Sequence, residues 1–323
     1  MPQPSISYAC GRVGVLGKSA LSMAQLERLM ATHTYEEARR TLSDVGFLTG
    51  EGADFQAAAD AHVKRACELI QKVTPEPEIT GCFQLRYDIH NLKVLLKSRS
   101  LAQKPQFLSQ CGTLNADTLR HAVTERRYGA LEENLAKTLN RLEKELARKF
   151  DPMLIDAELD KAMYRMIFQR LEKTGNAAVK RYFTAKVDLQ NFIMLLRSKA
   201  MGKDGAFFAK LFLPCGSVSL SSFQRAFDDA ERLGRLLTPY GQKVSRAAQL
   251  CVTDPGKLPL MEKTADDYLY SLFKGVKTQS LNMLIAYLLR VQREATDVRL
   301  IMAAKLNGFE QRELEERVRE LNG

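Results

Sequence analysis

Long stretches of the chain carry apolar residues at helical spacing and contain no proline. Proline is absent from residues 106–151, 153–213 and 260–323, and these stretches are rich in Leu, Ala, Glu, Lys, Arg and Met, which favour helices. Between Leu131 and Leu146, leucines recur every three or four residues, which is the spacing of one helix face. Alternating strand patterns are almost absent. The sequence therefore predicts an all-α protein.

Capping residues and prolines predict where these helices begin and end. A helix follows Ser22, and Thr34 with Glu37 has the spacing of a capping box. Residues 1–20 are the least regular part, with glycine at 11, 14 and 17. Other helices are expected over about 54–73, 81–99, 131–150, 280–306 and 310–321. Five more helices are expected to begin at Asn115 or Asp117, at Asp156, at Asn176, at Ser219 or Ser221, and at Pro259.

One twelve-residue pattern occurs three times, about 100 residues apart. Residues 188–199 (DLQNFIMLLRSK) and 88–99 (DIHNLKVLLKSR) share five of their twelve positions, and a weaker copy covers 294–305. This period is close to the size of a small domain. We therefore expect three related helical units, at 1–107, 108–207 and 208–323.

The polar residues of the pattern are the structural repeat motif. Its first and fourth positions lie three residues apart, so they share one helix face at the edge of the apolar stripe. Polar groups placed in this way usually satisfy a neighbouring helix end or loop. A surface built by three such units for binding a partner stays open as an alternative. The six motif residues are Asp88, Asn91, Asp188, Asn191, Glu294 and Asp297.

Composition narrows the class of protein. The 323 residues are 45% hydrophobic and 27% charged, which is ordinary for a soluble globular chain. The net charge of +10 has no basic tail and fits a membrane surface, an acidic protein or nucleic acid without selecting one. The most apolar segment, Leu281–Leu289, is too short to span a membrane, and the N-terminus does not resemble a signal peptide.

Cysteine and histidine give no support for a metal site or a disulfide framework. The six cysteines form no CxxC pair and the four histidines are scattered. Reduced thiols in a cytosolic protein are the simplest interpretation. No cofactor is expected.

Residues 11–19 end in Gly-Lys-Ser, as a phosphate-binding loop does. That loop requires a glycine at the position of Arg12, whereas Gly11 comes one residue too early. It also requires a preceding buried strand, which the sequence does not predict. We expect an irregular N-terminal segment or a weak helix here.

Other candidate chemistry is also weak. The adjacent acids Asp228–Asp229 and Asp266–Asp267 would point about 100° apart on a helix, so first-turn or solvated charges are expected. Basic and aromatic residues alternate only at Lys180–Phe183, which is too little for a nucleic-acid stacking surface. No catalytic set can be assembled, so catalytic residues are predicted to be absent.

The motif copies, taken in order with other landmarks, resemble one family. These landmarks are the segments Tyr8–Val13, Leu159–Lys161 and Tyr287–Gly308, followed by the charged run Glu310–Arg317. The chain is similar to the C subunit of V-type and A-type rotary ATPases, whose counterpart in the eukaryotic vacuolar enzyme is the d subunit. The likeness covers nearly the whole chain. It departs at glycine-rich residues 11–17, where the family usually has a more regular helix.

The resemblance implies a fold and a role. The fold would be three homologous helical bundles in a pseudo-threefold, funnel-like arrangement. The role would be a non-catalytic rotor subunit that links the central stalk subunits to the membrane proteolipid ring and transmits torque. The protein would lie at the cytoplasmic face as a peripheral component, with no nucleic acid bound. The residues that bind these partners are not identified by the sequence.

Three contrasting hypotheses remain at this point. The nearest is another helical adaptor that works at a membrane surface. A nucleotide-binding enzyme using residues 11–19 would bind nucleotide as the isolated chain. A basic helical RNA-binding protein would show RNA affinity that falls steeply with salt.

Overall fold

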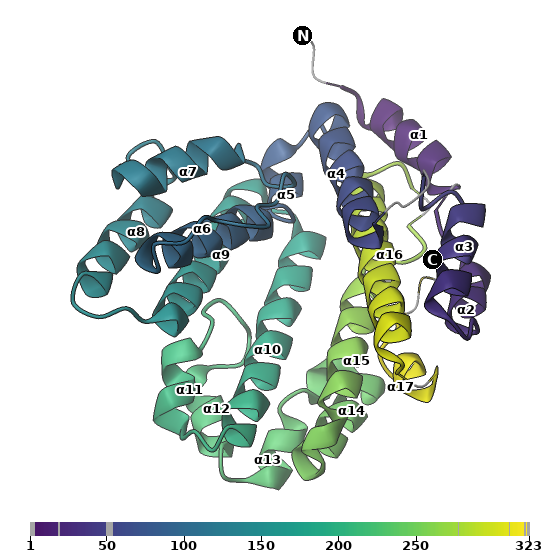
Figure 1. The fold of residues 1–323 in the computed structure, drawn as a ribbon. Helices are drawn as coiled ribbons and strands as arrows, with labels where there is room; N and C mark the ends of the chain where they lie inside the picture. The colour runs from purple at the N-terminus through teal and green to yellow at the C-terminus, as the bar shows by residue number, and fades with distance from the viewer. Residues whose placement is uncertain are drawn as a thin grey trace. The chain divides into compact units, whose positions relative to one another are not determined.

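The computed structural model describes residues 4–18, 20–49, 54–276, 278–309, 311–319 and 321. Within these ranges the secondary structure is helical and contains no strand, so the predicted all-α class is confirmed. Helix contacts divide the chain into two compact units (Figure 1). Unit 1 combines residues 1–76 with 256–323, and unit 2 is the continuous stretch 77–255.

Unit 1 is organised around its longest helix. Helix α16 carries buried apolar residues on most of its faces, which is the pattern of a helix surrounded by others. Helices α4, α1 and α3 pack on it, so both ends of the sequence contribute to one core (Figure 1). The elements of unit 1 are α1 (Ile6–Gly17), α2 (Met23–Met30), α3 (Tyr35–Asp44), α4 (Phe55–Val73), α15 (Leu258–Ser271), α16 (Leu281–Asn307) and α17 (Gln311–Glu315).

Unit 2 contains the first two motif helices, α6 and α10. Helix α9 packs against α6 and α8, and α11 packs beside α10. Phe83, Tyr182 and Phe183 form an aromatic cluster with ring centroids 5.0–5.1 Å apart. The elements of unit 2 are α5 (Pro77–Gly81), α6 (Leu85–Ser100), α7 (Ala116–Glu125), α8 (Glu133–Leu146), α9 (Pro152–Thr174), α10 (Ala177–Ala200), α11 (Gly205–Leu211), α12 (Leu220–Ala226), α13 (Ala230–Arg235), the single turn η1 (Thr238–Tyr240) and α14 (Gln242–Thr253).

Several predicted helix starts are confirmed by their capping bonds. The Ser22 side chain accepts from the Gln25 N–H at 3.2 Å, and the Gln25 side chain accepts from the Ser22 N–H at 2.8 Å. Asp54 caps α4, which covers the expected residues and ends at Val73. Ser219 caps α12. Each cap satisfies backbone donors that a helix start leaves free.

Of the two N-terminal expectations, the helix is the one observed, because residues 6–17 form a regular helix. Ser5 caps α1 by accepting from the Tyr8 N–H at 3.2 Å. Ala9, Cys10 and Val13 are buried, so packing compensates for the weak helix propensity of the glycines. Gly14 permits a close approach, since an added Cβ would lie 3.3 Å from the Met283 methyl on α16.

The prediction of a helix over 310–321 was also wrong in extent. Helix α17 ends at Glu315, and the chain then turns to bury Val318 and Leu321 in the core of unit 1. The burial of these side chains accounts for the early end of the helix. Residue 310 lies outside the described residues.

The three-bundle division at 1–107, 108–207 and 208–323 stays a prediction. The two compact units are defined by the contacts within each of them, and they do not test whether each motif copy has its own bundle. They do show that the third motif helix, α16, shares a core with helices from the start of the chain.

The packing of α1 makes a prediction about its glycines. Gly11→Ala is expected to raise the free energy of unfolding by about 0.5–1 kcal/mol, because alanine favours a helix interior and nothing lies within 4 Å of the new methyl. Gly14→Ala should gain less, because the Met283 methyl must move. Thermal denaturation of both variants measures this order, and a larger gain for Gly14→Ala would contradict it.

Candidate functional site: the repeated acid–amide motif

The first motif acid, Asp88 on α6, binds a loop that lies far away in the sequence. Its carboxylate accepts from the Thr113 N–H at 2.9 Å, the Thr113 hydroxyl at 2.6 Å and the Leu114 N–H at 3.1 Å. Burial raises the pKa of Asp88 above its usual value, and the hydrogen bonds from Thr113 and Leu114 oppose that shift. The side chain is 1% exposed. Asp88 is therefore an internal acceptor for loop backbone, directly before α7.

The second copy repeats this arrangement. Asp188 on α10 accepts from the Ser217 N–H at 2.9 Å, from the Ser217 hydroxyl and from the Val218 N–H at 3.0 Å. The Tyr240 hydroxyl also donates to it. The loop again leads directly into the N-terminus of a short helix, here α12. Two segments about 100 residues apart thus use the same hydrogen-bond scheme.

A glycine makes each of these approaches possible. A Cβ on Gly112 would lie 2.0 Å from an Asp88 carboxylate oxygen, and one on Gly216 would lie 2.1 Å from the corresponding oxygen of Asp188. Such distances exclude any side chain unless the loop moves away. Both glycines follow a cysteine and precede a hydroxyl residue, in the sequences Cys111-Gly-Thr113 and Cys215-Gly-Ser217. Sequence reasoning missed this second repeat, although the recurring triplet at a spacing of about 100 residues could have revealed it.

The motif amides each bind both polar groups of one residue. Asn91 Oδ1 accepts from the Ser109 N–H at 2.7 Å, and its Nδ2 donates to the Ser109 carbonyl at 2.9 Å. Asn191 makes the same pair with Leu213, at 2.8 and 3.0 Å. Asn91 and Asn191 are fully buried. The chain segment that returns along each motif helix is therefore held at two points, one by the acid and one by the amide.

The basic residue at the end of each copy binds the C-terminal end of another helix. Arg99 donates to the Val123 carbonyl in α7, and Lys199 donates to the Phe227 carbonyl at the end of α12. Lys305 donates to the Met30 carbonyl at 2.7 Å, at the end of α2. Cations at a helix C-terminus satisfy unpaired carbonyls and interact favourably with the negative end of the helix dipole.

In the first copy, the spacing within the motif matches the length of the short helix beside it. Arg99 lies eleven positions after Asp88, which is about 16 Å along a helix. Helix α7 has 10 residues, or about 15 Å, so one motif helix can bind it at both ends. In the third copy α2 is bound in a similar way, because Arg290 donates to the Leu21 carbonyl at 3.1 Å and Lys305 binds its other end.

The third copy departs from the other two at its acids. Glu294 is fully buried and lies 3.0 Å from His62 Nε2 on α4 and 3.1 Å from Arg290 Nε on its own helix. Asp297 replaces the amide and accepts from the Arg319 N–H at 3.1 Å. In each copy, the two polar residues therefore lie near each other on one motif helix. The three copies lie on three separate helices, α6, α10 and α16.

The other candidate residues contribute to helix formation, capping, packing or ion pairs. Residues 11–17 lie in α1, which is not the loop conformation that phosphate binding requires, and Ser19 lies outside the described residues. Asp229 caps α13. Tyr182 and Phe183 are buried, so their rings are not available to stack on bases. Asp266 and Asp267 lie inside α15 and not in its first turn. Asp266 is half exposed, as expected of a solvated charge, and pairs with Arg319, whereas Asp267 is more buried and pairs with Arg293.

The family assignment rests on a match over most of the chain. A sequence model of the family described as "ATP synthase (C/AC39) subunit" matches residues 9–317, which include every motif residue. The chain belongs to this family. Its members named below are C subunits of V-type or A-type ATPases, so the resemblance seen in the sequence is confirmed.

Curated relatives agree with this assignment over long alignments. The C subunit of the V-type sodium ATPase of Enterococcus hirae is 24% identical, over 84% of each chain. The C subunit of the A-type ATP synthase of Thermococcus gammatolerans is 20% identical, over 96% of this chain and 88% of the relative. The protein of the same name from Desulfurococcus sp. is 23% identical, over 98% of this chain and 90% of the relative.

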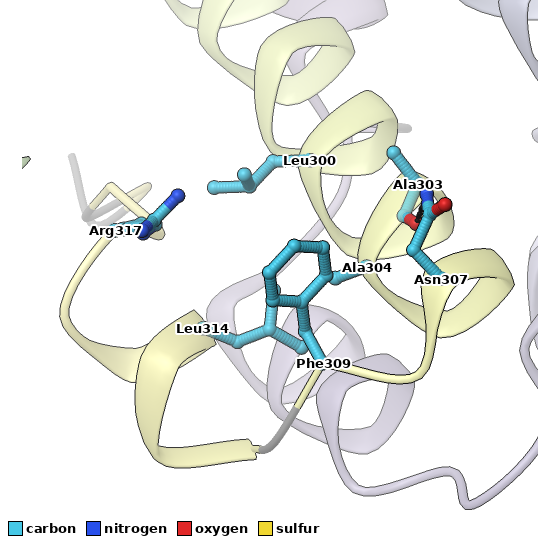
Figure 2. A pocket seen from close by; sticks show the side chains of 7 residues that line it. All are labelled: Leu300, Ala303, Ala304, Asn307, Phe309, Leu314 and Arg317. Carbon is cyan, nitrogen blue, oxygen red and sulfur yellow. Dashed lines mark hydrogen bonds between the residues drawn. The ribbon is translucent and has the colours of Figure 1, made fainter.

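This C/AC39 family member shows a small apolar hollow at the end of α16 (Figure 2). Its volume of about 90 Å³ is well below the several hundred Å³ of ordinary ligand pockets. In the part of the chain that the structure describes, no group of three His, Cys, Asp or Glu side chains could bind a metal ion. No described helix is long and apolar enough to cross a bilayer. The hollow is lined by Leu300, Ala303, Ala304, Asn307, Phe309, Leu314 and Arg317.

The glycine contacts give a direct test of the motif. Gly216→Ala is expected to lower the free energy of unfolding by at least about 2 kcal/mol, because the new methyl would force the loop away from the buried Asp188. Gly129→Ala in the same unit is the matched control, with nothing within 4 Å of its Cβ, and should change stability by less than about 0.5 kcal/mol. Urea denaturation measures both, and equal effects would show that the close approach has no energetic role.

Proposed function

We propose that this chain is the non-catalytic central-rotor subunit of a V/A-type ATPase. It joins the central stalk subunits to the membrane proteolipid ring and transmits torque between them. It works as a peripheral component at the cytoplasmic face of the membrane, while ATP is hydrolysed or synthesised by other subunits. The observation that carries this proposal is the family match over residues 9–317, which spans both compact units.

The bonding of the motif supports a mechanical role. A part that transmits torque must resist bending, and long packed helices supply stiffness. In unit 2, each motif helix also binds the start of a short helix through a buried acid and its end through a basic residue. Movement of the short helix relative to the motif helix would break these buried hydrogen bonds, so it is costly.

The arrangement as three homologous bundles around a pseudo-threefold axis forms part of the same proposal. The three copies of the terminal basic residue, each bound to the end of a short helix, support this. In the third copy the short helix is α2, from the beginning of the chain. If the first residues of the chain complete the third bundle in this way, the first and third bundles are also joined.

The charge of the chain is consistent with this site of action. The net charge of +10 favours a position near the anionic inner surface of a membrane. Attraction of this kind would assist assembly on the proteolipid ring. It would weaken at high salt, whereas the specific protein contacts would persist.

Loss of coupling is the decisive test of this role. In membrane vesicles from cells that lack this chain, ATP-driven ion uptake should fall to background while the catalytic part of the complex still hydrolyses ATP. Adding back the purified chain should restore uptake, and Gly216→Ala protein should restore less than the Gly129→Ala control. Normal ion uptake without the chain would refute the coupling role.

Affinity purification identifies the partners independently. The tagged chain, taken from detergent-solubilised membranes, should bring the proteolipid together with stalk and catalytic subunits, and part of this assembly should survive a high-salt wash. Recovery of nucleic acid or of the chain alone would favour one of the contrasting hypotheses. Nucleotide binding by the isolated chain would direct attention back to residues 11–19.

A further inference from the structure

The fourth motif position is an amide in two copies and a carboxyl in the third. Asn91 and Asn191 each use both side-chain atoms, accepting an N–H through Oδ1 and donating to the carbonyl of the same residue through Nδ2. Asp297 stands at this position in α16, and its Oδ1 accepts from the Arg319 N–H at 3.1 Å. The sequence separation of 22 residues equals that between Asn191 and Leu213. Asp297 thus reproduces the accepting half of the amide pair.

The donating half is what a carboxylate cannot supply. Asp297 is fully buried, and its Oδ2 has no hydrogen-bond partner among the residues that the structure describes. An ionised carboxyl has acceptors only, whereas the neutral acid has one O–H donor. A buried, partly unsatisfied anion is costly, so the site favours the neutral acid.

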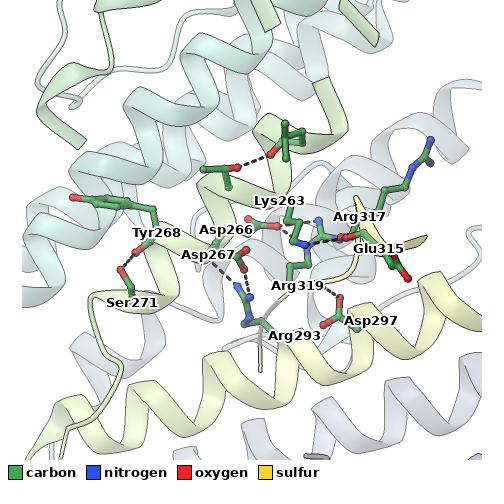
Figure 3. A network of polar contacts seen from close by, with 12 residues as sticks. Lys263, Asp266, Asp267, Tyr268, Ser271, Arg293, Asp297, Glu315, Arg317 and Arg319 are labelled. Atoms are coloured by element: carbon green, nitrogen blue, oxygen red, sulfur yellow. Dashed lines mark hydrogen bonds and ion pairs between the residues drawn. The ribbon is translucent and has the colours of Figure 1, made fainter. Parts of the chain in front are cut away.

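The charged groups around Asp297 only partly offset that cost. From α15, Asp266 and Asp267 approach, and these acids engage the guanidinium groups of Arg319 and Arg293 (Figure 3). On the α4 side, His62 faces Glu294 instead. Burial raises the pKa of Asp297 to about 7, while the Arg319 N–H and the two arginines oppose the shift and Asp267 adds to it.

We propose that Asp297 is a proton-dependent latch that fastens the segment 311–319 to α16. In the protonated state its O–H would donate to the Arg319 carbonyl, as Nδ2 of Asn91 and Asn191 donates to the carbonyl of the residue that Oδ1 binds. Its Oδ1 accepts from the Arg319 N–H. When the proton leaves to solvent, the donor is lost and a buried anion remains. The segment is then attached more weakly. The burial of Leu314 and Val318, the ion pair of Arg319 with Asp266, and the bond from Lys263 to the Glu315 carbonyl remain.

The direction of the pH effect follows from the two protonation states. Between about pH 4 and pH 7 the latched state keeps its proton, whereas an exposed aspartate loses it. The contribution of the latch is therefore complete at acid pH and decreases as the pH rises towards 7. Above about pH 7 both states are ionised, and the dependence levels off.

A reciprocal exchange of acid and amide tests the latch in the full-length chain. The readout is hydrogen–deuterium exchange of the peptide covering 311–319 from pH 5 to pH 8, corrected for the intrinsic exchange rate. Wild-type protection should fall about tenfold per pH unit up to about pH 7. Asp297→Asn should abolish this slope and keep the segment protected at pH 8. Asp60→Asn, at an exposed carboxyl that pairs with Arg299 on α16 and has no contact with Arg319, should retain the slope.

The reverse change should create a latch where none exists. Asn191→Asp should make protection around Leu213 depend on pH, whereas in the wild-type chain it should not. Carbon NMR of the Asp297 carboxyl supplies a direct check, with an expected titration midpoint near pH 7. A midpoint near pH 4, or the same slope in wild type and Asp297→Asn, would overturn the proposal. The Asp297→Asn comparison decides by itself should Asn191→Asp fail to fold.

Discussion

The structure of unit 2 depends on hydrogen bonds from loop backbone to buried motif side chains. A buried carboxylate is stable only where donors replace the water it has lost. Asp88 receives three hydrogen bonds and Asp188 four, all from residues 25 or more positions further along the chain. These bonds determine where the return segment lies, and hence where α7 and α12 begin.

Other sequence features follow from this constraint. The loop must approach the carboxylate so closely that only glycine fits at 112 and 216. The residue after each glycine carries a hydroxyl, which donates to the same carboxylate. A basic residue three turns further along the motif helix then meets the far end of the short helix. One helix thus fixes the position and direction of its neighbour.

The sequence was sufficient to predict the features that depend on local patterns. Apolar spacing and caps predicted the all-α class and helices such as α4, and the repeat located α6, α10 and α16. The true extent of α17 depended on tertiary contacts, because the burial of Val318 and Leu321 overrides a helix-favouring composition. The regular form of α1 likewise required knowledge of its packing on α16.

The sequence identified the residues of the candidate site, but it did not identify most of their hydrogen-bond partners. The shared face of Asp88 and Asn91 correctly indicated contacts with a loop, but not which loop. The replacement of an amide by Asp297 was visible in the sequence, whereas its unpartnered oxygen emerges only from the packing. The pairing of Glu294 with His62, 232 residues away, had no local signal at all.

The bond from Lys305 to the end of α2 has a consequence for biosynthesis. Its two partners are separated by 275 residues, and the whole of unit 2 is translated between the two halves of unit 1. Contacts between distant segments form late, because a long loop must first be closed. On the ribosome, the N-terminal helices must wait with exposed apolar faces until α16 emerges, while the continuous unit 2 can complete its core first. The nascent chain therefore needs protection from aggregation at its beginning rather than in its middle.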